Sequence, residues 1–184
     1  MTNTRRIVGW GALTLLLIAY ESAGSAQQTV NKMSDVADRL KTDLAGEPVT
    51  VRQQGPVTLT SRADVMFPSG GWELKQGVPA QEMPVLSKIV PTLAKLQHTE
   101  IVVGGYTDNT PIGPQLQSAG ITSNLHLSCM RAASVVGYLV SQGVNPNLLS
   151  AQCFGATHPV EPNDTPDGQA KNRRVDITLT GDGT

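Results

Sequence analysis

The 184-residue sequence is poor in aromatic side chains, which make up 4% of it, and it contains only two cysteines. Two cysteines are too few for a disulfide scaffold, and too few for a structural zinc site built from cysteine alone. The 14 basic and 15 acidic residues nearly cancel, which argues against binding to nucleic acid through bulk charge. A single long apolar run excludes a polytopic membrane protein. The length allows one domain, or one domain with an appendage.

That apolar run covers residues 7–20, follows Arg5 and Arg6, and precedes small residues that end at Ala26. This is the layout of a secretory signal peptide, because the run is shorter than the roughly 20 apolar residues of a spanning helix. We therefore expect residues 1–26 to be an export signal and the rest of the chain to lie outside the cytoplasm. The alternative is an uncleaved segment that associates the protein with a membrane.

Strand-like and helix-like segments alternate along the rest of the chain, which favours an α/β two-layer sandwich with helices packed on a sheet. Strands are expected at 49–51, 57–60, 100–106, 148–154 and 174–179, and helices at 30–44, 84–96 and 125–142. Pro91 should kink or interrupt the second helix, because it lacks an N–H group. Polar loops are expected at 108–122 and 159–168.

The helix expected at 30–44 has apolar residues at helical spacing and a polar opposite face. Gly46 and Pro48 follow it and should end it. We interpret it as an amphipathic lead-in rather than as part of the domain core. Pairing of this helix with a partner, or with a second copy in a homodimer, stays open.

Arg131 occupies a position where the helix at 125–142 should be apolar. It lies four residues from both Leu127 and Val135, so its guanidinium would face the sheet and would need a partner. Asp108, at the end of the preceding strand, is the expected partner. A carboxylate, a guanidinium and the free N–H groups of a helix start would together suit a zwitterionic ligand. An internal salt bridge between Asp108 and Arg131, which only fixes the loop, is the alternative.

Four further side chains, His126, Cys129, Cys153 and His158, leave several interpretations open. Two cysteines and two histidines could bind zinc, although their spacing matches no standard motif. A disulfide between Cys129 and Cys153 is favoured over zinc, because exported compartments are oxidising. Two buried free thiols are a third interpretation. His126 and Cys129 could also form a base and a nucleophile, but no third orienting group is evident, so we expect neither an enzyme nor a metal site.

Separated blocks of the sequence form a recognisable pattern. They read Gly105-Tyr106-Thr107-Asp108-Asn109, Asn124-Leu125-His126-Leu127-Ser128 with Arg131-Ala132, Asn163-Asp164-Thr165-Pro166 and Asn172-Arg173-Arg174-Val175. In this order, over roughly Val57 to Leu179, they resemble the OmpA-like peptidoglycan-binding domain, which also occurs in Pal lipoproteins and in the stator protein MotB. The loop 110–123 is longer than in OmpA itself and is similar to the MotB-like subgroup.

The resemblance implies a β-α-β-α-β-β sandwich that binds the diaminopimelate of the peptidoglycan stem peptide without catalysis and without a cofactor. The family's gripping Asp and Arg map onto Asp108 and Arg131, and its Asn maps onto Asn124. One of the two closing arginines is expected to shape the pocket, and Leu127 to line it. The implied binding residues are Asp108, Asn124, Leu127, Arg131, Arg173 and Arg174.

The sequence departs from the family pattern at His126, Cys129, Cys153 and Gln169, and these departures bear on affinity more than on fold. The expected organisation is an export signal at 1–26, an amphipathic helix and linker at 27–56, the OmpA-like domain at 57–180 and a tail at 181–184.

We expect a periplasmic protein that tethers itself, or the outer envelope, to the cell wall and has no nucleic-acid partner. The alternative is a wall-anchoring subunit of a membrane machine, such as a MotB-like stator or a secretion system. The apolar run contains no acidic residue, which argues against ion coupling of the stator type.

Overall fold

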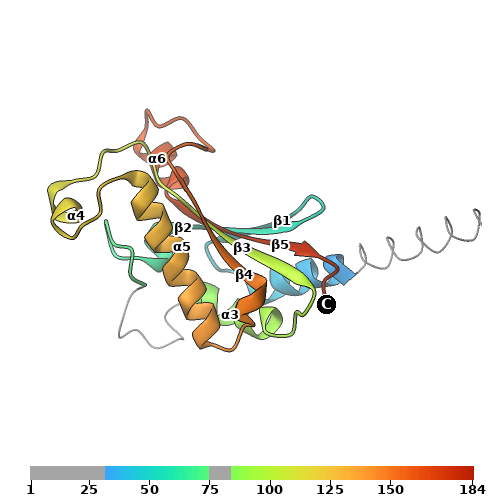
Figure 1. The fold of residues 1–184 in the computed structure, drawn as a ribbon. Coiled ribbons are helices and arrows are strands. Elements are labelled where there is room, and N and C mark those ends of the chain that lie inside the picture. The colour runs from blue at the N-terminus through green and yellow to red at the C-terminus, as the bar shows by residue number, and fades with distance from the viewer. Residues whose placement is uncertain (1–31, 75–83) are drawn as a thin grey trace, which may run out of the picture.

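The computed structural model describes residues 32–74 and 84–184 (Figure 1). The expected export signal, residues 1–26, lies outside the described residues. Within the described ranges, no helix combines the length and the apolar character needed to cross a membrane.

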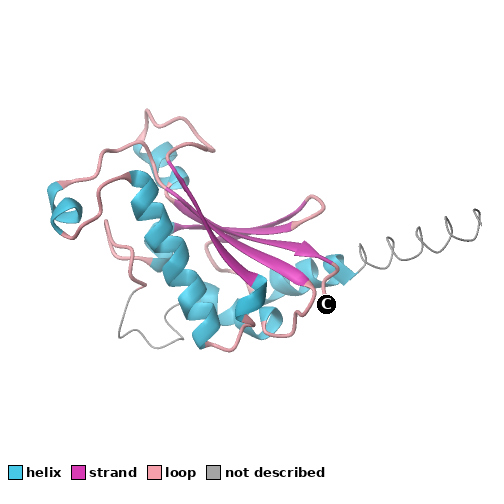
Figure 2. Cartoon of the chain, viewed as in Figure 1, coloured by secondary structure: helices cyan, strands magenta, loops and turns pink. Residues whose placement is uncertain are grey.

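A five-stranded sheet forms the centre of the fold, with the strand order β1-β2-β5-β3-β4 (Figures 1 and 2). Its strands are β1 (Val49–Gln53), β2 (Val57–Arg62), β3 (Thr99–Tyr106), β4 (Leu149–Gly155) and β5 (Arg174–Gly181). Only β3 and β4 run parallel, and the helix α5 provides the crossover between them. Each expected strand is present, within two residues at its ends.

The described helices include three longer ones that pack on the sheet and several short ones in the connections. They are α2 (Ala63–Met66), α3 (Pro84–Leu93), α4 (Pro114–Ser118), α5 (Asn124–Ser141), α6 (Pro166–Asn172), the 3-10 turn η2 (Pro146–Leu148) and a helix over 32–43. Figure 2 shows α5, α3 and the helix over 32–43 on one side of the sheet. This confirms the expected two-layer α/β sandwich.

Alternation along the strands explains why one face of the sheet carries the helices. In β3, Ile101 and Val103 are buried under the helices, and Ile177 and Leu179 of the neighbouring β5 share that face. Threonine residues such as Thr178 alternate with them and face the opposite side. The helices therefore cover the apolar face, and the face rich in hydroxyl groups is left without a helix in the described part of the chain.

Two expectations for the connections need correction. Of the kink or interruption expected at Pro91, the interruption is absent. The helix α3 continues to Leu93, because buried side chains such as Ile89 and Leu93 hold it on the core on both sides of the proline. Segments expected to be loops contain the short helices α4 and α6. Both begin with a proline in the first turn, where a backbone N–H has no partner within the helix and its loss costs nothing. Because α6 lies between β4 and β5, the fold has one helix more before its last strand than the β-α-β-α-β-β order implies.

The helix over 32–43 belongs to the core, contrary to its interpretation as a lead-in. Met33, Ala37 and Leu40 are at most 3% exposed and belong to the same hydrophobic cluster as the strand residues. The carboxylate of Asp43 also accepts a hydrogen bond from Thr92 of α3, at 3.4 Å. The expected linker likewise contributes β1, which pairs with β2 in the sheet. The sequence pattern correctly predicted an amphipathic helix, but it did not show that the apolar side of this helix packs into the core of the domain.

Truncation of Leu40 tests this placement. We expect Leu40→Ala to lower the free energy of unfolding by about 2–5 kcal/mol, because it removes a fully buried side chain and leaves a cavity. Urea denaturation followed by circular dichroism measures the change. The neighbouring exposed residue provides a control, since Arg39→Ala should change the stability by no more than about 0.5 kcal/mol. Equal stabilities of the two variants would contradict the placement of this helix in the core.

Candidate functional site

A cavity of about 560 Å³ lies where β3 ends, beside the first half of α5. Five of the six predicted binding residues line it, namely Asp108, Asn124, Leu127, Arg131 and Arg173. The remaining walls come from the segments 63–70 and 107–116. The structure thus brings together residues that are up to 65 positions apart in the sequence.

The start of α5 sets three of these side chains on one face. The Ser123 hydroxyl caps the helix by accepting a hydrogen bond from the backbone N–H of His126 at 3.0 Å. From this fixed start, Asn124, Leu127 and Arg131 follow at spacings of three and four residues, which places them on the same side of the helix. That side faces the cavity.

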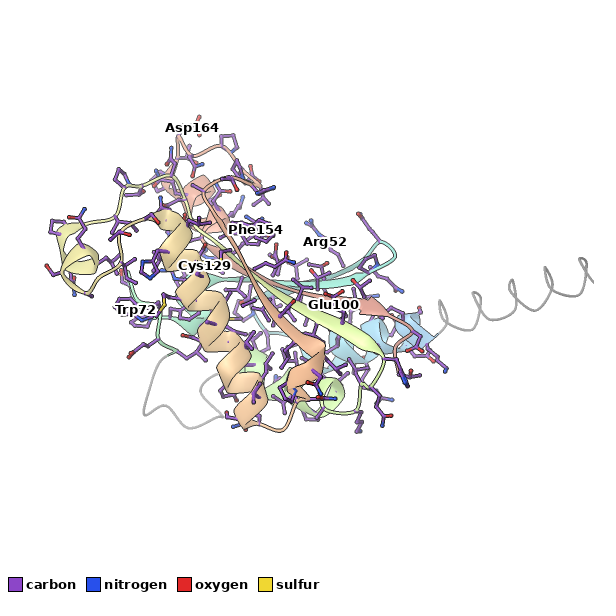
Figure 3. The ribbon with its side chains drawn as sticks, in the orientation of Figure 1. Arg52, Trp72, Glu100, Cys129, Phe154 and Asp164 are labelled. Carbon is purple, nitrogen blue, oxygen red and sulfur yellow. A yellow bond between two sulfur atoms is a disulfide. The ribbon has the colours of Figure 1, made fainter. Side chains whose placement is uncertain are left out.

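α5 lies directly on the backbone of the sheet at this point. A Cβ atom at Gly105 of β3 would come within 2.1 Å of the carbonyl oxygen of Ser128, so only glycine permits the contact. The Ser128 hydroxyl accepts a hydrogen bond from the N–H of Gly155 at 3.0 Å. A disulfide joins Cys129 of α5 to Cys153 of β4, with Cα atoms 4.7 Å apart; Figure 3 shows Cys129 between the helix and the sheet. These contacts hold the cavity-facing turns of α5 in place.

Asp108 pairs with Arg173 and not with Arg131, its expected partner. The Asp108 carboxylate is buried; Oδ2 lies 2.5 Å from Nη1 of Arg173, and Oδ1 accepts a hydrogen bond from the N–H of Thr110 at 3.0 Å. The reason is the register of the sheet. Because antiparallel pairing places Gly105 opposite Val175, the residues just beyond β3 lie beside those just before β5. A cross-strand register of this kind is not visible in helical spacing.

Arg131 is 4% exposed and forms no ion pair within residues 32–74 and 84–184. Its Nε donates to the carbonyl of Gly71 at 2.9 Å, and its guanidinium carbon lies 5.5 Å from the centre of the Phe67 ring. Its Nη1 is buried and has no hydrogen-bond partner in the described part of the chain. Burial is the main cause that lowers the pKa of Arg131 to about 10; repulsion from Arg173 adds to this, and Asp108 opposes it. The guanidinium therefore stays charged at neutral pH, at the cost of lost hydration.

The cavity thus combines two guanidinium groups with the carboxylates of Asp108 and Asp64. A carboxylate group of a ligand would complete the hydrogen bonding of Arg131, and Asp108 provides a negative group for a ligand ammonium. Asn124 has a different role, because its side-chain amide donates to the backbone carbonyls of Asp108 and Thr110, at 3.3 and 2.9 Å. It positions the loop that carries Asp108.

The second closing arginine, Arg174, does not reach this cavity. Its Nε donates to Asp176 at 3.1 Å, its Nη1 donates to the carbonyl of His158 at 3.2 Å, and its guanidinium lies 3.7 Å from the centre of the Tyr106 ring. Of the two arginines between which the sequence did not decide, Arg173 is the one that lines the cavity.

Sequence reasoning missed two groups that hold Arg131, the Phe67 ring and the Gly71 carbonyl. The signal that could have found them is the outline Phe67-Pro68-Ser69-Gly70, which resembles the family's Phe-x-x-Gly pattern. Its spacing places an aromatic ring just before a turn.

The disulfide removes the competing interpretations that needed thiols. With Cys129 and Cys153 bonded to each other, neither remains as a zinc ligand or as a nucleophile beside His126. Among the residues described, no three or more histidine, cysteine or acidic side chains gather to hold a metal ion. Cys153 also adopts no positive φ, so its place at a family glycine position costs no backbone strain.

Comparison with known proteins gives the following matches. The model of the OmpA family matches residues 66–173. The probable lipoprotein YiaD of Escherichia coli is 34% identical over 182 residues, which cover 98% of this chain and 76% of YiaD. The peptidoglycan-binding protein ArfA of Mycobacterium tuberculosis is 32% identical over 126 residues, which cover 68% of this chain and 35% of ArfA. For several such relatives, the match therefore covers only about a third of their length.

Among solved structures, the cell wall anchor of the type VI secretion system from Pseudomonas aeruginosa superimposes with a TM-score of 0.67. It is 29% identical, and the match covers 79% of this chain and 99% of the anchor. The likeness extends well beyond the cavity and includes most of the described sandwich.

Removal of the disulfide tests its part in this arrangement. We expect the double variant Cys129→Ser, Cys153→Ser to lose about 3 kcal/mol of unfolding free energy, because the bond closes a loop of 24 residues in the unfolded chain. Urea denaturation measures the loss, and the unmodified protein under reducing conditions should match the variant. Mass spectrometry should show a gain of two hydrogen atoms on reduction, and an unchanged mass would contradict the bond.

Proposed function

The chain belongs to the OmpA family, and we propose that its domain binds the stem peptide of peptidoglycan at the cavity of Asp108 and Arg131, without catalysing a reaction. The observation that carries this proposal is the buried guanidinium of Arg131, whose Nη1 has no hydrogen-bond partner among the described residues although Arg131 lines the cavity. A buried charge left in this way is costly unless a ligand completes it.

Diaminopimelate fits the charges of the cavity. Its side chain ends in an ammonium and a carboxylate on the same carbon, so it is a zwitterion at neutral pH. The ligand carboxylate would accept hydrogen bonds from Arg131, and the ligand ammonium would lie against Asp108. Arg173 holds the Asp108 carboxylate on its other side, which keeps the carboxylate in position.

The proposed binding agrees with the names of two relatives. ArfA is described as peptidoglycan-binding, and the solved Pseudomonas structure as a cell wall anchor. In this proposal the domain lies in the periplasm and tethers its own chain to the wall. Binding, and not hydrolysis, is the expected outcome, because the polar groups of the cavity are ion pairs and backbone contacts rather than a nucleophile with its base.

A second candidate function is a wall-anchoring subunit of a larger membrane machine. The likeness to the secretion-system anchor favours it, because that protein shares nearly all of its structure with this chain. The binding chemistry is the same in both cases, and only the partner at the membrane differs.

The mature N-terminus distinguishes a free periplasmic protein from a membrane-anchored one. We expect the protein isolated from its own envelope to start at Gln27, because the small residues before it suit signal cleavage. Mass spectrometry of the intact protein measures this directly. A chain that still starts at Met1 or Thr2 would contradict cleavage and would indicate an anchor.

Sedimentation with purified cell-wall sacculi tests the site. Arg131→Ala and Asp108→Ala should each abolish a micromolar interaction, since loss of one half of a buried, hydrogen-bonded charge pair costs about 2–5 kcal/mol. The fraction of protein in the pellet measures binding, and circular dichroism confirms that each variant is folded.

Arg39→Ala provides the matched control, because it removes an exposed arginine far from the cavity lining. This variant should sediment like the unmodified protein. If the folded Arg131 and Asp108 variants also sediment like the unmodified protein, the cavity is not the binding site.

A further inference from the structure

A second cavity, of about 950 Å³, lies on the face of the sheet that carries no helix in the described chain. We call it the sheet-face groove. Its floor comes from β1, β2 and β5, and residues near α6 form one of its walls. Four threonines lie on the floor, Thr50, Thr58, Thr60 and Thr178. Figure 3 shows Arg52 and Phe154 on the same side of the sheet, away from α5.

The charges around the groove are almost all paired within the protein. The pairs are Arg174 with Asp176 at 3.1 Å, Lys171 with Glu161 at 3.6 Å, Glu47 with Lys88 at 2.6 Å, and Arg62 with Asp64. Arg52 is the remaining charged residue of the lining. The groove therefore presents hydroxyl groups and compensated charges, which suit an uncharged polar ligand better than an ion.

The carboxylate of Asp176, which lines the groove, can accept a further hydrogen bond from a ligand. Its Oδ2 accepts from Nε of Arg174, whereas its Oδ1 is buried and has no hydrogen-bond partner in the segments that the structure describes. Arg174 cannot turn toward Oδ1, because the Tyr106 ring and the His158 carbonyl hold its guanidinium. A hydroxyl or amide N–H of a ligand would complete this carboxylate. Beside it, the hydroxyls of Thr58 and Thr178 lie 3.3 Å apart and can both donate and accept.

The groove adjoins the cavity of Arg131 at one end of the sheet. Arg62 lines the groove and Asp64 lines the cavity, and their side chains form an ion pair across the rim between them. The consecutive residues Arg173 and Arg174 are divided in the same way, one on each side. A ligand that fills the cavity and continues across this rim therefore enters the groove.

We propose that the sheet-face groove binds the uncharged sugar backbone of the wall polymer, beside the stem peptide. This inference rests on the proposed function, because the peptide in the cavity is what brings its sugar to the rim. Sugars carry the many hydroxyl and acetamide groups that the threonines and Asp176 require. An extended peptide spans about 3.3–3.6 Å per residue, so the residues that link diaminopimelate to the sugar can cross a narrow rim.

Calorimetric titration of the full chain with two synthetic ligands tests the proposal. One ligand is the free stem peptide, and the other is the same peptide on its disaccharide. We expect the disaccharide peptide to bind about tenfold more tightly, which is what one added hydrogen bond to a charged group contributes. Thr60→Tyr fills the groove with a side chain that strands favour, and it should remove this difference while the free peptide binds as before.

Thr180→Tyr is the matched control, because Thr180 lies on the same face of β5 but outside the groove. It should keep the tenfold preference. Equal binding of the two ligands by the unmodified protein, or an unchanged preference in Thr60→Tyr, would overturn the sugar site and leave the peptide site standing. Absence of binding by both ligands would instead overturn the proposed function itself.

Discussion

The backbone of α5 touches the backbone of β3 at Gly105, and the geometry of the cavity depends on this contact. A side chain at Gly105 would collide with the Ser128 carbonyl, so the helix would have to move away from the sheet. The hydrogen bond from Gly155 to Ser128 and the disulfide at Cys129 act within the same turns of the helix. Together they fix Arg131 next to the loop after β3, since a helix held at one turn carries all its side chains as a rigid body.

At the cavity, electrostatic pairing leaves the buried charge of Arg131 without an ion pair among the described residues. Asp108 forms its ion pair with Arg173. The guanidinium of Arg131 therefore has only a backbone carbonyl and an aromatic ring as partners among the described groups. The fold thus carries a destabilising buried cation, and packing elsewhere compensates for it. On the opposite face, Asp176 is ion-paired with Arg174, but its Oδ1 has no hydrogen-bond partner within the described ranges. Both groups border cavities, where a ligand can supply what the protein does not.

Local patterns predicted the strands, the two-layer sandwich and the unusual position of Arg131, because these follow from spacing within one element. The resemblance to a family predicted the ligand and the remaining binding residues. Contacts between distant elements were harder to predict. The partner of Asp108 depends on the register between β3 and β5, and the burial of Leu40 depends on where the first helix docks. The pairing of Cys129 with Cys153 was favoured, but only the crossover of α5 onto β4 brings the two residues together.

The division of Arg173 and Arg174 between the two sides of the sheet follows from the two-residue period of a strand. A single residue inserted or deleted just before β5 would displace Arg173 from the cavity, since buried side chains such as Ile177 and Leu179 hold β5 itself in register. This short segment is thus far less tolerant of length changes than of substitutions. Variation in loop length within the domain should concentrate elsewhere, for example in the segment 110–123, whose length sets the outer wall of the cavity and not the register of the sheet.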